Sequence, residues 1–272
     1  MTMSEATTKA VAVSRKPLGI NWIGMYAIVR REVTDSMRHP TQAVLAPWIS
    51  AFIFIFVFGY VIGNRMPHIA GRSYLTFLMP GIVMMDVVTV AFTQASADLY
   101  FARFQRYVQE MLISPLSYFE MMAGSLGVAV LRAIVTALGI VVMGAGFGAF
   151  TIVDLPAFFF WIIAVSVIFG LLGLVVGLWA DNFEQLGALP IFLISPLSMV
   201  GGVFNTVAML PPWLRFLAYA NPFFYFINGL RSAMIGFHEG PPLLGVGLTL
   251  GLLIALALIV WRLFATGWGL RE

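Results

Sequence analysis

The chain has 272 residues, of which 61% are hydrophobic and only 10% are charged, and its formal net charge is +3. A soluble domain carries roughly 25% charged residues, so this composition excludes a water-soluble globular protein and predicts one helical bundle in lipid. The basic residues lie mostly in segments that we expect to face the cytoplasm, where anionic lipids attract them. We therefore expect membrane lipids, and no nucleic acid, as partners.

The sequence lacks the patterns that metal and phosphate chemistry need. It has no cysteine, and His39, His68 and His238 lie far apart, so we expect no metal site. Both lysines, Lys9 and Lys16, lie in the polar N-terminal tail and follow no Gly-rich turn. A Walker A loop needs a lysine in that setting to reach the nucleotide phosphates. We therefore expect no enzyme activity and no cofactor on this chain, with any ATP and Mg²⁺ held by a partner.

The N-terminal region divides into a tail and a surface helix. We expect residues 1–20 to form a flexible cytoplasmic tail and residues 21–40 to form an amphipathic interface helix that ends at Pro40. Apolar side chains at helical spacing form one stripe on it: Trp22, Tyr26, Val29, Val33 and Met37. Arg31 and Arg38 fall on the other side. The helix is either a membrane anchor alone or also a contact for a cytoplasmic partner, and we favour the second interpretation.

Residues 41–272 are expected to form one all-α transmembrane domain of six helices. A helix needs about 20 apolar residues to cross the hydrocarbon core. Six segments meet this requirement: 43–63, 74–96, 120–148, 156–179, 186–208 and 243–266. With the N-terminus inside, ten Lys and Arg residues flank the spans on the cytoplasmic side and four on the outer side. This bias predicts that both termini are cytoplasmic.

Two charged residues lie near mid-depth in neighbouring predicted spans. Asp86 and Arg132 are each about 12 residues from a span end, or about 18 Å along a helix. Isolated charges at that depth cost several kcal/mol, so they should pair or face water. We predict an intramembrane charge pair, which is either a structural ion pair or a substrate or gating contact. Three glycine pairs have the GxxxG spacing that permits close helix packing: Gly144 and Gly148, Gly173 and Gly177, and Gly247 and Gly251.

The loop from Asp98 to Glu120 contains a second amphipathic segment. Phe101 and Phe104 share one helical face, and Ser114-Pro115 ends the helix. Aromatic and arginine side chains are enriched at protein interfaces, so this loop predicts a docking surface for a cytoplasmic protein. With the interface helix, the predicted docking residues are Arg31, Arg38, Arg103, Phe104, Arg106, Tyr107 and Glu110.

Residues 209–242 are too apolar for an aqueous loop and too interrupted by proline for a span. They predict short helices that dip into the outer leaflet, which is permitted only where protein or water satisfies the free backbone groups. This segment is either an aromatic belt at the interface or a lid over a pathway. The predicted outer-gate residues are Pro211, Trp213, Asn221, Phe223, Phe224, Tyr225 and Arg231.

With these features in place, the chain resembles the integral-membrane subunits of ABC-2 type exporters, particularly the bacterial YadH-like branch. The resemblance covers nearly all residues from about 20 to the end. It rests on four motifs: Phe104-Gln-Arg106…Glu110-Met-Leu-Ile-Ser-Pro115, Gly201-Gly-Val-Phe204, Leu210-Pro-Pro-Trp213 and Asn221-Pro…Gly229-Leu-Arg231.

The resemblance implies a fold, a partner and a location. It implies six transmembrane helices, a connecting helix at 21–39, a coupling helix at 100–114 that receives an ATPase subunit, and an outer re-entrant pair at 210–236. The loop Asp181–Gln185 is expected to make a smaller second contact. Two copies of the chain would pair with two ATPase subunits in the bacterial inner membrane, with the pathway between the permeases. The family has no catalytic residues on this subunit.

Two questions stay open from the sequence. An ion-coupled secondary transporter or a channel is the main alternative, although it requires a coupling-ion site and the only acid near mid-depth is Asp86. No inverted repeat relates the two halves of the sequence, which weakens that alternative. The substrate is equally open, because a lipid-linked molecule, a glycolipid or polysaccharide, and an amphipathic drug all fit such a permease.

Overall fold

The computed structural model describes residues 24, 26, 29, 30 and 34, and then 45–63, 65, 68–69, 71–104, 118–149 and 151–266. The predicted tail, most of the interface helix and the loop at 105–117 therefore lie outside the described residues. The five described positions between 24 and 34 are all helical. In this segment the Thr34 hydroxyl donates to the Arg30 carbonyl at 2.7 Å.

Helices make up almost all of the described chain. The first half contains α3 (Ala46–Phe54), the π-helix η2 (Ile55–Ile62), the strands β1 (His68–Ile69) and β2 (Arg72–Ser73), α4 (Tyr74–Phe104) and α6 (Tyr118–Gly146). The second half contains α7 (Leu155–Trp179), α8 (Phe183–Leu189), the π-helix η3 (Pro190–Ile194), α9 (Ser195–Val200), the 3-10 turn η4 (Val207–Met209), α10 (Pro212–Ala220), α11 (Pro222–Ile235) and α12 (Pro242–Thr266). The two strands pair antiparallel, with His68 opposite Ser73, in a small hairpin that the sequence did not predict.

Five helices of the described chain are long and apolar enough to cross a membrane. They are Tyr74–Phe104, Met122–Gly146, Leu155–Trp179, Phe183–Val200 and Pro242–Thr266. The first predicted span is the shorter apolar helix Ala46–Ile62, which has the minimum length of about 17 residues that a span requires. The count of six spans therefore stays a prediction, while the helical, membrane-type architecture is confirmed.

Polar caps and glycines set several helix ends. Asp154 caps the start of α7 by accepting a hydrogen bond from the Ala157 N–H at 3.0 Å. Asn182 caps the start of α8 by accepting one from the Gln185 N–H at 3.0 Å. The fifth predicted span ends earlier than expected because Gly201 and Gly202 follow α9, and Gly202 has a φ of +95°. That positive φ favours glycine and turns the chain out of the helix.

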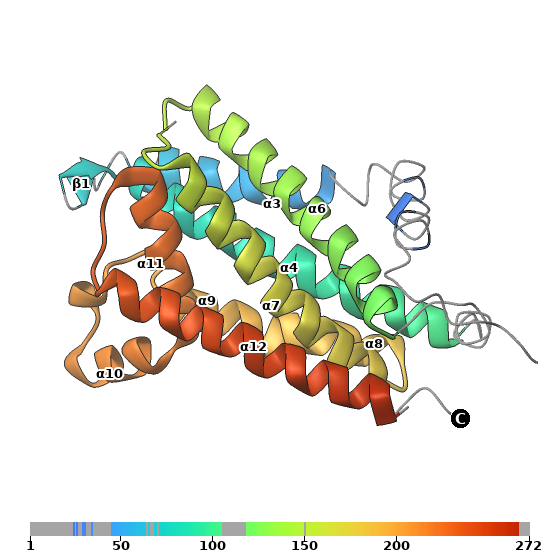
Figure 1. Ribbon diagram of the computed structural model, residues 1–272. Coiled ribbons are helices and arrows are strands. Elements are labelled where there is room, and N and C mark those ends of the chain that lie inside the picture. The colour runs from blue at the N-terminus through green and yellow to red at the C-terminus, as the bar shows by residue number, and fades with distance from the viewer. Residues whose placement is uncertain are drawn as a thin grey trace, which may run out of the picture.

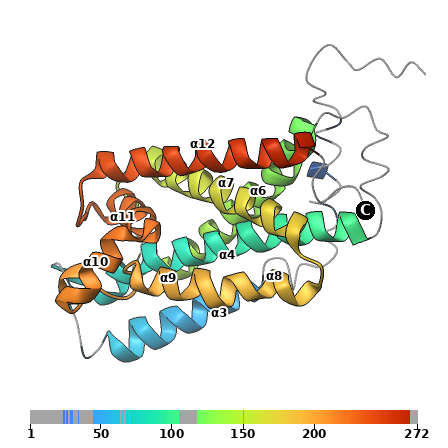
Figure 2. The ribbon, with the colours of Figure 1, turned by 90° about the horizontal axis from the view of Figure 1, so that it is seen from below.

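Helix α4 lies at the centre of the bundle (Figures 1 and 2). It contacts α6, α7 and α11, and also η2, α8 and η3. In Figure 2, α6, α7 and α12 lie on one side of α4, and α3 and the α8–α9 run lie on the other. The ends of α4 and α12 and the start of α8 lie together at one end, called the inner end after the predicted orientation. The hairpin, α10 and α11 lie at the opposite, outer end.

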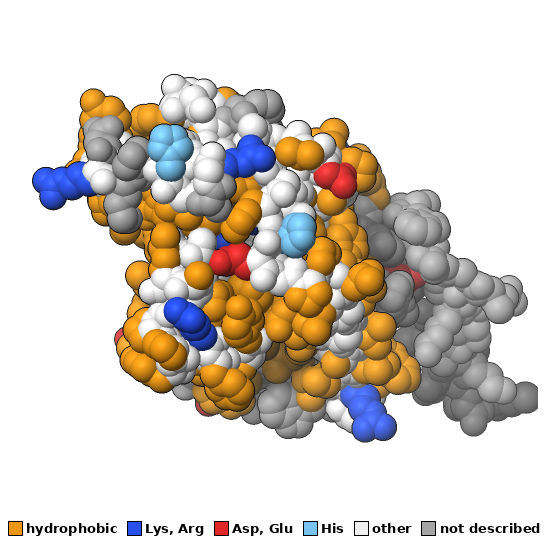
Figure 3. Space-filling model, turned by 90° about the vertical axis from the view of Figure 1, so that its left-hand side faces the viewer, with side chains coloured by type: hydrophobic (Ala, Val, Ile, Leu, Met, Phe, Trp, Pro, Cys, Tyr) orange, Lys and Arg blue, Asp and Glu red, His pale blue; other side chains and the backbone are white. Residues whose placement is uncertain are grey.

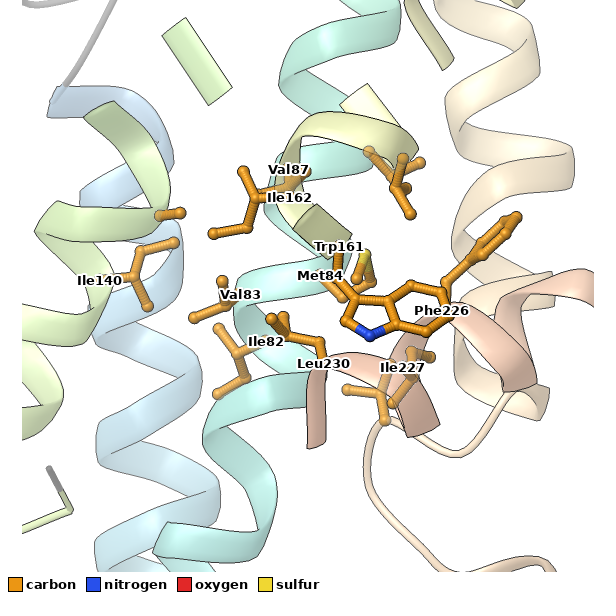
Figure 4. Close-up of a cluster of buried hydrophobic side chains, with 14 of the residues drawn as sticks. Ile82, Val83, Met84, Val87, Ile140, Trp161, Ile162, Phe226, Ile227 and Leu230 are labelled. Atoms are coloured by element: carbon orange, nitrogen blue, oxygen red, sulfur yellow. The ribbon is translucent and has the colours of Figure 1, made fainter. Parts of the chain in front are cut away.

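The hydrophobic core lies where α4, α6, α7 and α11 meet, as Figure 4 shows. Ile82 and Val83 of α4, Ile162 of α7 and Leu230 of α11 are all fully or almost fully buried there. Gly173 of α7 permits the close approach of α4, since a Cβ at this position would lie 2.5 Å from the Phe92 carbonyl oxygen. The close contact predicted from the GxxxG spacing is thus confirmed at Gly173, whereas a Cβ at Gly247 or Gly251 would meet no atom within 4 Å.

Candidate functional site

A groove of about 370 Å³ with polar groups set in apolar walls lies between α3, α4 and α6, and we call it the inner groove. Its walls come from the start of α3, from one face of α4 and from a single α6 side chain. The lining residues are Ala46, Pro47, Ser50, Asp86, Thr89, Val90, Thr93, Gln94, Ala97 and Arg132. Both charges that the sequence placed near mid-depth therefore line one groove.

Asp86 is a buried acid that has no hydrogen-bond partner among the described residues. Its side chain is 8% exposed, and its Oδ2 atom is fully covered and unpaired. No hydrogen bond or ion pair joins either carboxylate oxygen to any described residue. Because buried polar groups are normally satisfied, this carboxylate stands out as a candidate binding group.

Arg132 of α6 is held by residues of α4. Its Nη1 donates to Gln94 Oε1, and the Gln94 Nε2 group donates to both Asp98 oxygens at 2.7 and 2.8 Å. The Asp98 carboxylate also interacts electrostatically with the Arg132 guanidinium. The predicted charge pair between Asp86 and Arg132 is thus replaced by a relay from Arg132 through Gln94 to Asp98. The reason is register, because Gln94 lies about two turns beyond Asp86 along α4 and faces Arg132 directly.

Arg103, a predicted docking residue, has an internal role in the structure. Its Nη1 lies 3.0, 2.6 and 3.2 Å from the carbonyl oxygens of Gly177, Leu178 and Ala180, where α7 ends. A helix C-terminus carries unpaired carbonyls and partial negative charge, so a guanidinium there is stabilising. Arg103 therefore joins the inner ends of α4 and α7.

An aromatic cluster covers the inner end beside Arg103, and we call it the inner aromatic surface. Within α4, Tyr100 contacts both Phe101 and Phe104, and Phe183 of α8 contacts Tyr100 and Phe101. Phe104 is 75% exposed and Phe183 is 61% exposed. The predicted docking residues Arg31, Arg38, Arg106, Tyr107 and Glu110 lie outside the described residues.

The predicted outer-gate residues separate into exposed and buried groups. The exposed group lies on or beside α10 and includes Pro211 and Trp213, the latter 74% exposed. The buried group comprises Phe223 and Phe224 of α11 and the α11 cap, Asn221. Figure 3 shows this outer face as mostly hydrophobic, with scattered charged side chains.

Asn221 and Tyr225 fix the positions of α10 and α11. The Asn221 Oδ1 atom accepts from the Phe223 N–H at 3.0 Å, and its Nδ2 group donates to the Leu197 carbonyl of α9 at 2.6 Å. The Tyr225 hydroxyl donates to the Tyr219 carbonyl at 3.0 Å. Tyr225 also lines a second cavity, of about 180 Å³, between α7, α11 and α12.

Arg231 is the centre of a buried network rather than an accessible gate residue. It is 1% exposed, its Nη2 donates to the Gly202 carbonyl at 2.6 Å, and its Nη1 lies 3.9 Å from Glu239 Oε2. The guanidinium also stacks 3.9 Å from the centre of the Phe77 ring. Glu239 in turn accepts from the Val207 N–H at 3.1 Å. This network ties α11 to α4 and to the chain after α9.

Burial and neighbouring groups act in opposite directions on the pKa of Glu239 in this network. Burial raises the pKa of the Glu239 carboxyl, while Arg231 and the Val207 N–H act in the opposite direction. The Asn228 side-chain carbonyl accepts from the Glu239 N–H at 2.8 Å and fixes the loop that carries the carboxylate. The Arg231 guanidinium therefore favours the ionised form of Glu239 against the effect of burial.

Sequence reasoning missed Gln94, Asp98 and Glu239. The i, i+4 spacing of Gln94 and Asp98 on one helix was a usable signal, because such pairs meet on a helix surface. Glu239 carried no such signal, since its contact with Val207 spans 32 residues. Among the described residues, no group of three or more His, Asp or Glu side chains lies close enough to hold a metal ion.

Comparison with known proteins gives one consistent result. Residues 24–235 match the family described as ABC-2 type transporter. The chain is 30% identical over 251 residues to the inner membrane transport permease YadH of Escherichia coli strain K12, covering 92% of this chain and 98% of that protein. It is 26% identical over 242 residues to nodulation protein J of Rhizobium meliloti strain 1021, covering 89% and 90% of the two chains.

Proposed function

This chain belongs to the ABC-2 type transporter family, and we propose that it is the permease subunit of an exporter driven by a separate ABC ATPase. Its relatives include a protein named as an inner membrane transport permease, which supports placement in a bacterial inner membrane. The excess of Lys and Arg on one side of the predicted spans supports cytoplasmic termini. The two lysines of the chain lie in the N-terminal tail, so a Walker A lysine must come from the partner. ATP and Mg²⁺ would bind there.

The inner aromatic surface is the observation that carries this proposal. Phe104 and Phe183 are large apolar side chains exposed at the inner end, beside the point where α4 leads into residues 105–117. Exposed aromatic anchors of this kind are typical interface hot spots. We place the ATPase contact on this surface and on the adjoining loop that contains Arg106, Tyr107 and Glu110.

We also propose that two copies of the permease work with two ATPase subunits. The α3–η2 and α8–α9 segments support this arrangement, because they lie on the side of α4 away from α12 (Figure 2) and carry exposed apolar residues such as Phe52, Tyr60 and Phe192. ATP-driven closure of the ATPases would reorient the two bundles, provided that the ATPase binds the two arrangements with different affinities. The cargo would be lipid-linked, glycolipid or polysaccharide, or amphipathic and drug-like.

The proposal is tested by removing the inner aromatic surface. The double variant Phe104→Ala with Phe183→Ala should reduce co-purification of a co-expressed ABC ATPase about tenfold or more, because hot-spot truncations cost about 2 kcal/mol or more. The matched control is Trp213→Ala with Phe216→Ala, which removes two similarly exposed aromatics at the outer end. Undiminished ATPase capture by the inner variant would reject the docking assignment.

A second measurement separates this function from the main alternative. Proteoliposomes that contain the permease and its ATPase should transport only when nucleotide is supplied. Transport that persists without nucleotide and follows an imposed ion gradient would establish a secondary transporter or channel instead.

A further inference from the structure

The carboxylate of Asp86 has no partner within the described chain. This residue lies on α4, inside a predicted span, and more than nine-tenths of its side chain is buried. A buried carboxylate without a donor is costly in either protonation state, because its oxygens have lost water and gained nothing. The inner groove beside it provides space for a donor from another molecule.

The other groove residues define the chemistry of that molecule. Arg132 lines the same groove, so a ligand there meets both the Asp86 carboxylate and the Arg132 guanidinium, which also interacts with Asp98. A cationic group would be attracted by Asp86 and repelled by Arg132. An anionic group would be attracted by Arg132 and repelled by Asp86. A hydroxyl both donates and accepts hydrogen bonds, and it can therefore pair with either charged group.

Ser50, Thr89 and Thr93 add small polar side chains along the same walls. The Thr89 hydroxyl already donates to the Met85 carbonyl at 2.8 Å, which leaves its oxygen as an acceptor toward the groove. Ala46, Pro47, Val90 and Ala97 supply apolar wall between the polar groups. Sparse polar groups set in apolar walls are the usual design of a small-molecule site.

We propose that the inner groove binds the neutral, hydroxyl-bearing headgroup of an amphipathic molecule, with Asp86 accepting its hydrogen bonds. The proposal rests on the proposed function, since it assigns a cargo-binding site to the permease. The groove reaches from Asp86 toward the inner end, where α3 begins at Ala46. A headgroup from the cytoplasmic leaflet would therefore reach it while the alkyl chain stayed in lipid.

Photolabelling of the full-length permease in phosphatidylcholine nanodiscs tests the proposal. Three probes would carry the same dodecyl chain and the same diazirine beside the headgroup, which is glucose, ammonium or phosphate. Peptides are mapped by mass spectrometry after illumination. The glucoside should label peptides from the groove-lining parts of α3, α4 and α6 more strongly than the other two probes, and excess dodecyl maltoside should suppress this labelling.

Substitutions at Asp86 give the decisive comparison. Asp86→Leu should lower glucoside labelling of the groove about tenfold or more, because it removes a charged acceptor. Asp86→Asn keeps one acceptor oxygen and should fall between Asp86→Leu and the unmodified chain. Thr136→Val is the matched control, because the Thr136 hydroxyl is also buried and has no partner among the described residues but does not line the groove.

The possible outcomes are distinct. Equal labelling in the Asp86→Leu variant, in protein that elutes as a single folded species, overturns the site. Stronger groove labelling by the ammonium or phosphate probe overturns the ligand class. The assay contains neither nucleotide nor ATPase, so its failure leaves the ATP-driven function standing. Conversely, a failed ATPase test with intact labelling leaves a headgroup site in a transporter powered differently.

Discussion

Two buried charged residues, Arg231 at the outer end and Asp86 in the inner groove, have opposite surroundings. Arg231 is 1% exposed and contacts a carbonyl, a carboxylate and an aromatic ring. Asp86 is 8% exposed and receives no hydrogen bond from any described residue. The two residues lie on contacting helices, α11 and α4. Burial alone therefore does not distinguish a structural charge from a functional one.

The difference lies in the number of segments that each charge connects. Arg231 joins α11 to Phe77 of α4, to the Gly202 turn and to the Glu239 loop, so its removal would release several segments at once. Asp86 connects nothing within the described chain, and the residue instead lines the inner groove. A charge that holds no part of the fold together is the better candidate for contact with a ligand.

The largest expected effect follows from Arg231→Leu. This change leaves the Glu239 carboxylate buried without its cation and the Gly202 carbonyl without its donor, so we expect the free energy of unfolding to fall by about 3–5 kcal/mol. Thermal unfolding of the detergent-solubilised protein, followed by intrinsic tryptophan fluorescence, measures this loss.

Arg215→Leu provides the control for that experiment. Arg215 also donates to carbonyls, those of Leu210 and Ala208, but it is exposed on α10. Its loss should cost no more than about 1 kcal/mol. If Arg231→Leu were no more harmful than Arg215→Leu, the description of the outer network as a structural element would be wrong.

A smaller effect is expected from Arg103→Leu, which tests whether the inner end has its own structural arginine. Removal of a charged donor from the end of α7 should lower the free energy of unfolding by about 1.5–3 kcal/mol. The measurement uses the permease alone, without any ATPase, so a docking role cannot contribute. Arg103→Lys should recover part of the loss. Unchanged stability together with reduced ATPase capture would return Arg103 to the docking surface on which the sequence placed it.

The sequence predicted helix positions well where polar caps bound an apolar run. The span predicted at 156–179 is observed at Leu155–Trp179, because Asp154 caps its start and Pro156 suits a first helical turn. The span predicted at 186–208 is observed at Phe183–Val200. Hydropathy could not place the C-terminal end of this span, because residues beyond Val200, such as Val203, are also apolar. Val203 is apolar because it is buried against protein.

The candidate site was harder to predict because a sequence gives depth but not facing direction. Asp86 and Arg132 have similar depths, which suggested a pair, yet Arg132 meets Gln94 instead. Likewise, Arg231 and Arg103 looked like accessible basic residues, and only their tertiary contacts show that they bind backbone carbonyls. Partners this distant in sequence follow from packing, which a single sequence does not record.

The smallest expected effect on stability is that of Asp86→Leu, and it tests the comparison most directly. Replacement of an unsatisfied buried polar group by an apolar one of similar size is nearly neutral or stabilising, so the free energy of unfolding should change by less than about 1 kcal/mol or rise. Arg132→Leu is the contrasting variant, because it strips Gln94 and Asp98 of their cation and should destabilise the protein by more than about 1.5 kcal/mol. A strongly destabilised Asp86→Leu protein would mean that the carboxylate has a structural partner. Asp86 would then not be free to bind a ligand in the inner groove. A neutral result, together with lost glucoside labelling, would show that Asp86 serves a ligand and not the fold.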